Sequence, residues 1–217
     1  MDFNINEILH TISIWGLPVL LAVTLHEAAH GYVARLFGDN TAYMLGRVTL
    51  NPIKHVDPVG TIALPLGLTL IGSPFLIGYA RPVPVNFNNL SNLRWGEVCV
   101  AAAGPLMNIL LAFVSVGVAH IGFMNPMGFG EAIVTIAIAS IQINVVLAVF
   151  NLFPLLPLDG GRILHALLPG PLSYQFSKTE RFGFIIILLL LFSGVLWQII
   201  GPIIQYLNYA FITMLPI

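Results

Sequence analysis

The chain has 217 residues, of which 58% are hydrophobic and 8% charged, and its formal net charge is −1. Because soluble domains carry about 25% charged residues, this composition predicts an integral membrane protein and excludes an ordinary soluble enzyme. The sequence has no basic run, which argues against a nucleic-acid partner. The single cysteine, Cys99, cannot form an internal disulfide. It lies in an apolar run, so we expect it to be a small core residue.

Uncharged stretches predict the membrane spans. In chain order the candidates are 8–36, 58–80, 98–119, 132–155 and 182–200, with an apolar tail at 203–217 after a break at Gly201-Pro202. We therefore expect an all-α polytopic membrane protein, a helical bundle of about four to six transmembrane segments. In this interpretation 1–217 is one domain, with a core over about 8–165 and C-terminal membrane segments over 182–217. Neither a soluble module nor a cleaved signal peptide is expected.

The first predicted span contains a metal-ligand pattern, His26-Glu27-Ala28-Ala29-His30. Residues four apart on a helix share a face, so His26 and His30 can bind one metal ion, and Glu27 can reach a water on it. A charged Glu27 at membrane depth is costly and would be unusual without a use. The alternative is that the three side chains only satisfy hydrogen bonds between packed helices. The pattern favours a metal site inside the bilayer.

Glycine and proline repeatedly interrupt the candidate span 58–80. The positive-inside rule decides its placement. If the segment enters and leaves on one side, all eight Lys and Arg residues lie on one face; if it crosses, the division is three against five. We therefore predict a re-entrant or β-hairpin insertion around 58–85 that lines the site, with the N-terminus outside and the basic loops in the cytosol.

A catalytic zinc needs a third protein ligand and keeps a fourth position for water. The best candidate is Asp159, which ends the apolar run that begins at 132. Pro154 and Pro157 disrupt the helix just before it and re-aim the side chains that follow. Taken alone, Asp159 could also be a turn residue at the end of a helix.

Depth in the membrane gives an independent check on this candidate. His26 is nine residues before Arg35, which is about 13 Å along a helix, and Asp159 is three residues before Arg162. A re-entrant 58–80 puts both ends at the same side of the membrane. The fold-back that satisfies the charge rule therefore also brings Asp159 to the depth of His26.

Together these motifs resemble the site-2 protease family of intramembrane zinc metalloproteases. The resemblance covers about residues 20–165 and rests on five motifs that occur in the family's order. They are His26-Glu27-Ala28-Ala29-His30, Asn51-Pro52…His55…Asp57-Pro58…Gly60, Gly78-Tyr79-Ala80-Arg81-Pro82-Val83-Pro84-Val85, Gly104-Pro105-Leu106-Met107-Asn108 and Asn151…Pro154…Pro157-Leu158-Asp159-Gly160. The chain is similar to the compact bacterial and archaeal members, without PDZ or CBS modules.

The resemblance implies one zinc ion per chain, held by His26, His30 and Asp159, with Glu27 as the catalytic acid and base. It implies cleavage of a peptide bond in or near a substrate's transmembrane helix, towards the cytosolic side, as in regulated intramembrane proteolysis. The expected partners are a single-span membrane protein or a membrane-bound peptide, and the lipid bilayer. The expected location is the cell membrane, crossed several times, and assembly into a homo-oligomer is left open.

Two asparagines are further candidates for contact with the transition state or the substrate. Asn151 matches an asparagine of the family motif and is the first candidate for a donor to the oxyanion, although it could merely satisfy a backbone group near Pro154. Asn108 most simply makes a hydrogen bond across helices. A helical substrate must unwind before attack, and we expect the Pro-Val-Pro-Val run within 58–85 to offer an edge for the extended peptide.

Two other functions compete with a zinc endopeptidase. The first is a membrane metal-binding or substrate-holding protein without proteolytic activity, but such a protein has no use for a general base at Glu27. The second is a transporter that uses the histidines and Asp159 as a proton or metal pathway. Transport requires polar groups along the whole depth, whereas the outer halves of the predicted spans are nearly featureless. The sequence therefore favours the enzyme.

Overall fold

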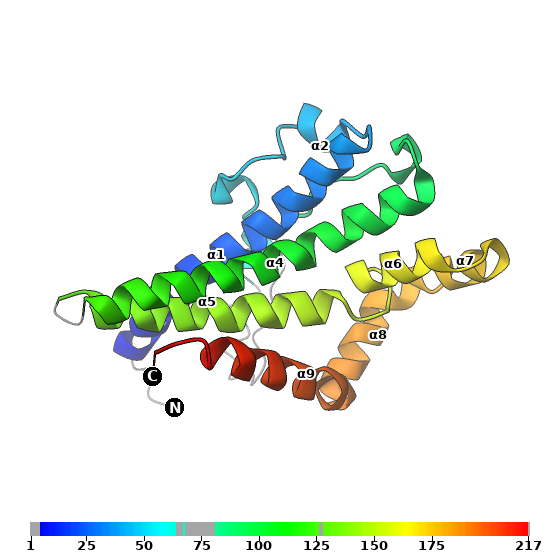
Figure 1. Cartoon of the computed structure of the whole chain (residues 1–217). Helices are drawn as coiled ribbons and strands as arrows, with labels where there is room; N and C mark the ends of the chain where they lie inside the picture. Colours follow the sequence, from blue (N-terminus) through cyan, green and yellow to red (C-terminus); the bar gives the residue numbers. More distant parts are fainter. Residues whose placement is uncertain (1–4, 64–66, 68–80, 126–127, 217) are drawn as a thin grey trace.

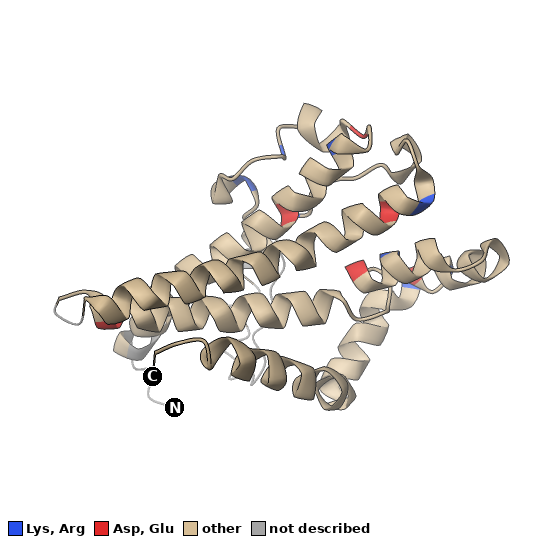
Figure 2. Ribbon diagram, in the orientation of Figure 1, with Lys and Arg blue, Asp and Glu red and all other residues tan. Residues whose placement is uncertain are grey.

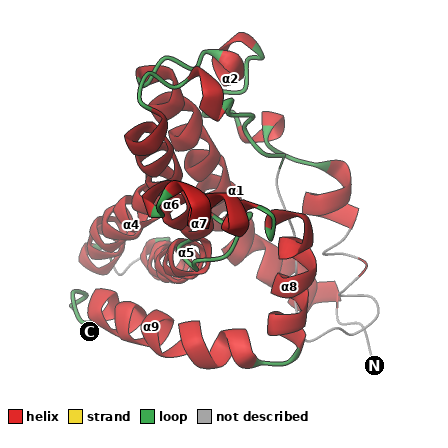
Figure 3. Cartoon of the chain, turned by 90° about the vertical axis from the view of Figure 1, so that its right-hand side faces the viewer, coloured by secondary structure: helices red, strands yellow, loops and turns green. Residues whose placement is uncertain are grey.

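Three long helices form the centre of the molecule. The computed structural model describes residues 5–63, 67, 81–125 and 128–216. In it, α1 (Ile5–Leu36), α4 (Leu93–Met124) and α5 (Gly130–Asn151) lie side by side (Figure 1). Viewed along these helices, α6 (Asp159–Leu167) and α7 (Gly170–Ser177) cover one end of the bundle, and α9 (Val195–Ile212) runs beside α5 (Figure 3). The short helix α2 (Thr41–Met44) follows α1.

The expected all-α polytopic membrane protein is confirmed. Among the described residues, four helices are long and apolar enough to cross a bilayer, and no strand is present. Large apolar side chains such as Leu106, Leu110 and Phe113 of α4 are exposed, as expected for a helix that faces lipid. The same exposure shows that the prediction for Cys99 was wrong, because its side chain lies on the outer face of α4 and not in the core.

The predicted span 182–200 was also wrong. It is divided between α8 (Glu180–Phe192) and α9, and the chain turns at Gly194, whose φ of 76° is a left-handed conformation that favours glycine. The predicted break at Gly201-Pro202 is absent, because Pro202 lies inside α9. A proline within a membrane helix is tolerated where neighbouring groups satisfy the freed carbonyl. Of these C-terminal helices, only α9 has the length of a span.

The insertion predicted around 58–85 lies mostly outside the described residues. Of its described parts, Pro58–Ala63 is a π-helical turn, and residues 81–85 have no regular secondary structure. The two flanks meet, because the Arg81 N–H donates to the His55 carbonyl at 2.9 Å. Both flanks of the insertion therefore lie next to each other. Figure 2 shows the Lys and Arg residues gathered towards the end of the bundle that carries α2, α6 and α7.

Residues 81–91, which we call the strap, connect this insertion to α4. The strap contains one 3-10 turn at Phe87–Asn89 and otherwise no regular secondary structure. Its apolar side chains pack with those of α1 and α4 in a small cluster that is separate from the main core. The cluster consists of Ala34, Leu90 and Val100 with Val33, Phe37, Val85 and Phe87 around them. The strap is thereby seated on the C-terminal half of α1.

Candidate metal centre

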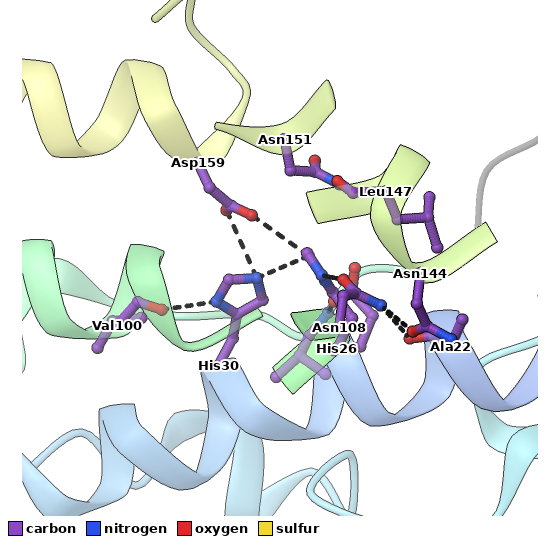
Figure 4. A network of polar contacts seen from close by, with 11 residues as sticks. Ala22, His26, His30, Val100, Asn108, Asn144, Leu147, Asn151 and Asp159 are labelled. Atoms are coloured by element: carbon purple, nitrogen blue, oxygen red, sulfur yellow. Dashed lines mark hydrogen bonds and ion pairs between the residues drawn. The ribbon is translucent and has the colours of Figure 1, made fainter. Parts of the chain in front are cut away.

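The two histidines of α1 meet the first residue of α6. His26 Nε2 lies 3.3 Å from Asp159 Oδ2, and His30 Nε2 lies 3.4 Å from Asp159 Oδ1 (Figure 4). The two Nε2 atoms are 3.0 Å apart. Both histidines are buried, and the Asp159 side chain is only 16% exposed. The structure therefore brings Asp159 to two histidines that precede it by more than a hundred residues in the sequence.

The geometry of the chain after α5 puts Asp159 in this position. The helix ends at Asn151, before Pro154 and Pro157, and α6 begins at Asp159. The next residue, Gly160, sits so close to the end of α5 that a Cβ there would overlap the Leu152 carbonyl group. Only glycine permits this approach, so the Asp159-Gly160 pair is a geometric requirement of the site as well as a chemical one.

Hydrogen bonds fix the tautomer of each imidazole. The His30 Nδ1 lies 2.7 Å from the Val100 carbonyl, which can only accept, so Nδ1 carries the proton. The His26 Nδ1 lies 2.6 Å from Asn108 Oδ1. Asn108 is turned this way because its Nδ2 donates to the Ala22 carbonyl at 3.2 Å and to Asn144 Oδ1 at 2.9 Å. His26 Nδ1 is therefore protonated too, and both Nε2 atoms present lone pairs to Asp159.

This donor set fits a cation. Two imidazole lone pairs and a carboxylate converge in a buried site, which is unfavourable unless a positive charge lies between them. Asp159 Oδ2 is buried and accepts no hydrogen bond from the part of the chain that the structure describes. The two Nε2 atoms are 3.0 Å apart and each lies 3.3–3.4 Å from a different oxygen of Asp159, close to roughly 3.3 Å, the distance between ligands of a tetrahedral zinc with bonds of about 2.0–2.1 Å. Two nitrogens and a carboxylate oxygen are ligands that zinc accepts.

Gly104 of α4 has a function that the sequence did not reveal. A Cβ at this position would lie 2.5 Å from His26 Nε2 and even closer to His30 Nε2. Alanine would therefore occupy the space in which the three donor atoms meet. The Gly104-Pro105…Asn108 motif thus serves the site twice, since Gly104 keeps the space open and Asn108 orients His26. From the sequence, only the hydrogen bond of Asn108 across helices was predicted.

The remaining candidates lie around this centre. Glu27 projects from another face of α1, where its Oε2 accepts a hydrogen bond of 2.7 Å from the Val83 N–H of the strap. Asn108 is fully buried, and the donor and acceptor groups of its amide are all engaged by protein groups. The Asn151 Nδ2 donates to the carbonyl of Leu147 in its own helix at 2.9 Å. Asn144 of α5 accepts a hydrogen bond from Asn108 and so joins α5 to α4.

Comparison with known proteins identifies the family. The model of peptidase family M50 matches residues 16–135 and 127–193 of the chain. The chain belongs to peptidase family M50. The site-2 protease resemblance of the five motifs is thereby confirmed, and so is zinc as the cofactor. The M50 chain is a zinc metalloprotease embedded in a membrane by several helices.

Several relatives carry this activity in their names. "Putative zinc metalloprotease YwhC" of Bacillus subtilis (strain 168) is 41% identical over 195 residues, which cover 85% of this chain and 84% of that protein. "Putative zinc metalloprotease Rip2" of Mycolicibacterium smegmatis is 29% identical over 82% of this chain and 66% of that protein. "Zinc metalloprotease MJ0392" of Methanocaldococcus jannaschii is 26% identical over 90% of this chain and 51% of that protein. No solved structure matches the chain significantly.

Proposed function

We propose that this M50 protease is an intramembrane endopeptidase whose zinc is held by His26, His30 and Asp159 and whose general base is Glu27. The observation that carries the proposal is the convergence of the three donor atoms, all within 4.8 Å of one another, at a helix that is apolar enough to span a bilayer. A soluble protease has no reason to bury its metal among lipid-facing helices. The proposed substrate is therefore the transmembrane helix of another membrane protein.

The protein side chains divide the work. When bound, zinc supplies the Lewis acidity that polarises the substrate carbonyl and makes water acidic enough to react at neutral pH. Glu27 takes a proton from the attacking water and delivers it to the leaving amine. Asn108 and the Val100 carbonyl hold the imidazoles in one tautomer. The buried and fully engaged amide of Asn108 supports this positioning role rather than contact with substrate.

A second asparagine remains the proposed donor to the developing oxyanion. Asn151 is at the end of α5, and only one of its two amide hydrogens is needed for the bond to Leu147. The other hydrogen can serve the substrate. Asn151→Ala should therefore lower turnover while the zinc content stays as in the wild type.

We also propose that the N-terminus is outside and that the site opens towards the cytosol. The clustering of Lys and Arg near α2, α6 and α7 supports this orientation through the positive-inside rule (Figure 2). So does the meeting of Arg81 with His55, which puts both flanks of the insertion on that side. In this orientation Asp159 and His30 are closer to the cytosolic end of the bundle than to the outer one.

The test uses purified protein in detergent. Zinc content is measured for the wild type and for His26→Ala, Asp159→Ala and Glu27→Gln. We expect the first two to lose zinc and activity, and Glu27→Gln to keep zinc while cleavage falls by about 10²–10⁴-fold. Glu27→Gln is also used as a trap, so that single-span membrane proteins bound to it become test substrates for the wild type. If Asp159→Ala leaves the zinc content unchanged, or if Glu27→Gln still cleaves substrate, the assignment is wrong.

A further inference from the structure

The catalytic carboxylate has a partner that is not a side chain. The Val83 N–H donates to Glu27 Oε2 at 2.7 Å, and Val83 is only 7% exposed. Only one carboxylate oxygen is occupied by this bond, so Oε1 is left for the proton that Glu27 must move. A buried N–H bonded to a charged group gives one of the stronger hydrogen bonds in proteins. The bond therefore restricts the Glu27 side chain to rotamers that keep Oε2 next to the Val83 N–H.

The strap is in direct contact with α1 one helical turn further on. A Cβ on Gly31 would lie 3.0 Å from Val83 Cγ1 and 2.8 Å from Val48 Cγ2. The absence of a side chain at Gly31 therefore allows the strap to approach the helix next to Glu27. This is a second feature of α1 that fits the strap.

Both ends of the strap are anchored. At its start, the Arg81 N–H donates to the His55 carbonyl at 2.9 Å, and at its end the Ser91 N–H donates to the Phe37 carbonyl at 2.7 Å. Between these points lies Asp39, which is fully buried just after α1. Its Oδ2 accepts from the Asn86 N–H at 2.8 Å, and its Oδ1 accepts from Asn89 Nδ2 at 3.1 Å.

Asp39 also closes a turn of its own. The same Oδ1 accepts from the Thr41 N–H at 3.1 Å and from the Thr41 hydroxyl. One carboxylate thus ties the end of α1 to two residues of the strap. None of these hydrogen bonds involves His26, His30 or Asp159. The network therefore holds the strap in place and does not support the proposed metal ligands directly.

We propose that the strap is the positioning element of the general base: Val83 orients the Glu27 carboxylate through its N–H, and Asp39 latches the strap to α1. The inference rests on the proposed role of Glu27. A free glutamate side chain has several rotamers, and proton transfer needs one of them. Holding Oε2 selects that rotamer before the substrate arrives. Val83 and Asp39 act through Glu27 and are positioning residues.

The first test detects the contact itself and requires neither zinc nor substrate. Pro82 and Pro84 have no amide hydrogen, so a peptide over 82–85 reports exchange at Val83 and Val85 alone. In metal-free protein we expect the Val83 amide to exchange at least about tenfold more slowly than the Val85 amide. Glu27→Ala should abolish the difference, whereas Glu27→Gln should retain it because the amide oxygen still accepts. Equal exchange at the two amides in the wild type would overturn the proposal.

The second test removes the N–H donor of Val83. Val83→Pro deletes the N–H that Glu27 accepts, in a segment that already has prolines on both sides. We expect kcat on a trapped single-span test protein to fall at least about tenfold, with KM and zinc content unchanged. Val83→Ala is the matched control, since it shortens the same side chain but keeps the N–H, and it should lower kcat by less than about threefold. Equal losses in the two variants would overturn the role of Val83.

The third test addresses the latch. Asp39→Ala should speed exchange at the Val83 amide several-fold and lower kcat, while zinc stays bound because no metal ligand has moved. If the Asn86 amide loses protection but the Val83 amide does not, Asp39 is not part of the positioning element. These outcomes are independent of the proposed function: should Glu27→Gln cleave as well as the wild type, the proposed function fails, and the exchange data still judge the contact.

Discussion

His26 and His30 project from the face of α1 that packs against α4 and α6, whereas Glu27 and Gly31 lie on the face covered by the strap. On the first face every contact comes from a helix: the Val100 carbonyl, the Asn108 amide and the carboxylate that begins α6. On the second face, among the described residues, the hydrogen bond to Glu27 comes from one backbone N–H in a segment without regular secondary structure. The two faces are thus supported by different kinds of structure.

The difference has a mechanistic consequence. Metal ligands must hold their separations to a few tenths of an ångström, and helices packed through buried polar groups provide that rigidity. A general base must be oriented, but it also exchanges protons with water and substrate, and one peripheral hydrogen bond suffices to bias its rotamer. Perturbing the helix face should therefore remove zinc, and perturbing the strap face should slow turnover while zinc remains.

The largest expected effect follows from Gly104→Ala. The new Cβ would lie 2.5 Å from His26 Nε2, and both imidazoles are held by their Nδ1 hydrogen bonds, so they cannot move aside without losing them. We expect zinc content to fall at least about tenfold and cleavage to fall to background. Gly117→Ala is the matched control in the same helix, since nothing lies within 4 Å of its Cβ. Zinc analysis of both purified variants tests this prediction. A Gly104→Ala variant with as much zinc per chain as the wild type would contradict the proposed ligand set.

Asn108→Leu should have the next largest effect. It removes the acceptor for the His26 Nδ1 proton, and losses of such outer hydrogen bonds lower metal affinity by about 10–100-fold. Competition with a chelator measures this change directly. Ser115→Ala is a suitable comparison, because Ser115 bonds Ser140 across the same pair of helices but contacts neither histidine. If both variants hold zinc equally well, the orienting role of Asn108 is wrong.

Gly31→Ala tests the opposite face of the same helix. The Cβ would meet Val48 and Val83 at 2.8 and 3.0 Å, so the strap must shift by a few tenths of an ångström. We expect kcat to fall by about threefold to tenfold with zinc retained. Gly16→Ala, whose Cβ would only make an ordinary 3.7 Å contact with Ile12, should leave kcat as it is. Loss of zinc from Gly31→Ala would break the division between the two faces.

These two faces also differ in how well the sequence predicts them. His26, His30 and Asp159 could be found from residue type, helical spacing and depth, since metal binding is a property of side chains. Their backbone partners could not, because the Val100 carbonyl on the first face and the Val83 N–H on the second are groups that every sequence possesses. The role of Gly104 was hidden for a related reason: the space left by a missing side chain has meaning only once its neighbours are known.

The fold shows the same contrast. The long helices α1, α4 and α5 follow from uncharged stretches of spanning length. The end of the chain does not, because Gly194 and Pro202 are both helix-breaking residues by propensity, yet only Gly194 interrupts the helix. Local propensity ranks Pro202 as the stronger breaker, and the packing of α9 on α5 overrides it. Tertiary contacts of this kind have no signature in a single sequence.

The smallest expected effect concerns the stability that Asp39 contributes. Burial alone would raise the pKa of Asp39, but hydrogen bonds from Thr41, Asn86 and Asn89 outweigh burial and lower the pKa below its usual value. The pKa of Asp39 in the folded protein is thus below that in the unfolded chain, which is about 3.9. The stabilisation is therefore fully present above about pH 3.9 and is lost as the pH falls through the folded pKa. Asp39→Asn should therefore lower the free energy of unfolding by about 1–2 kcal/mol at pH 7. The difference from the wild type should shrink below about pH 4.

Unfolding followed in detergent between pH 7 and pH 3 measures this difference. Glu131→Gln, which alters an exposed carboxylate on α5, serves as the control and should track the wild type throughout. The prediction also compares the two faces of α1. Protonation of Asp39 weakens its hydrogen bonds to the strap, so the strap should detach before the helices that carry the proposed metal ligands unfold. In metal-free protein at acid pH, the Val83 amide should then lose protection before the amides of α1, α4 and α5 do. Earlier loss of protection in these helices would mean that the strap is not the weaker support.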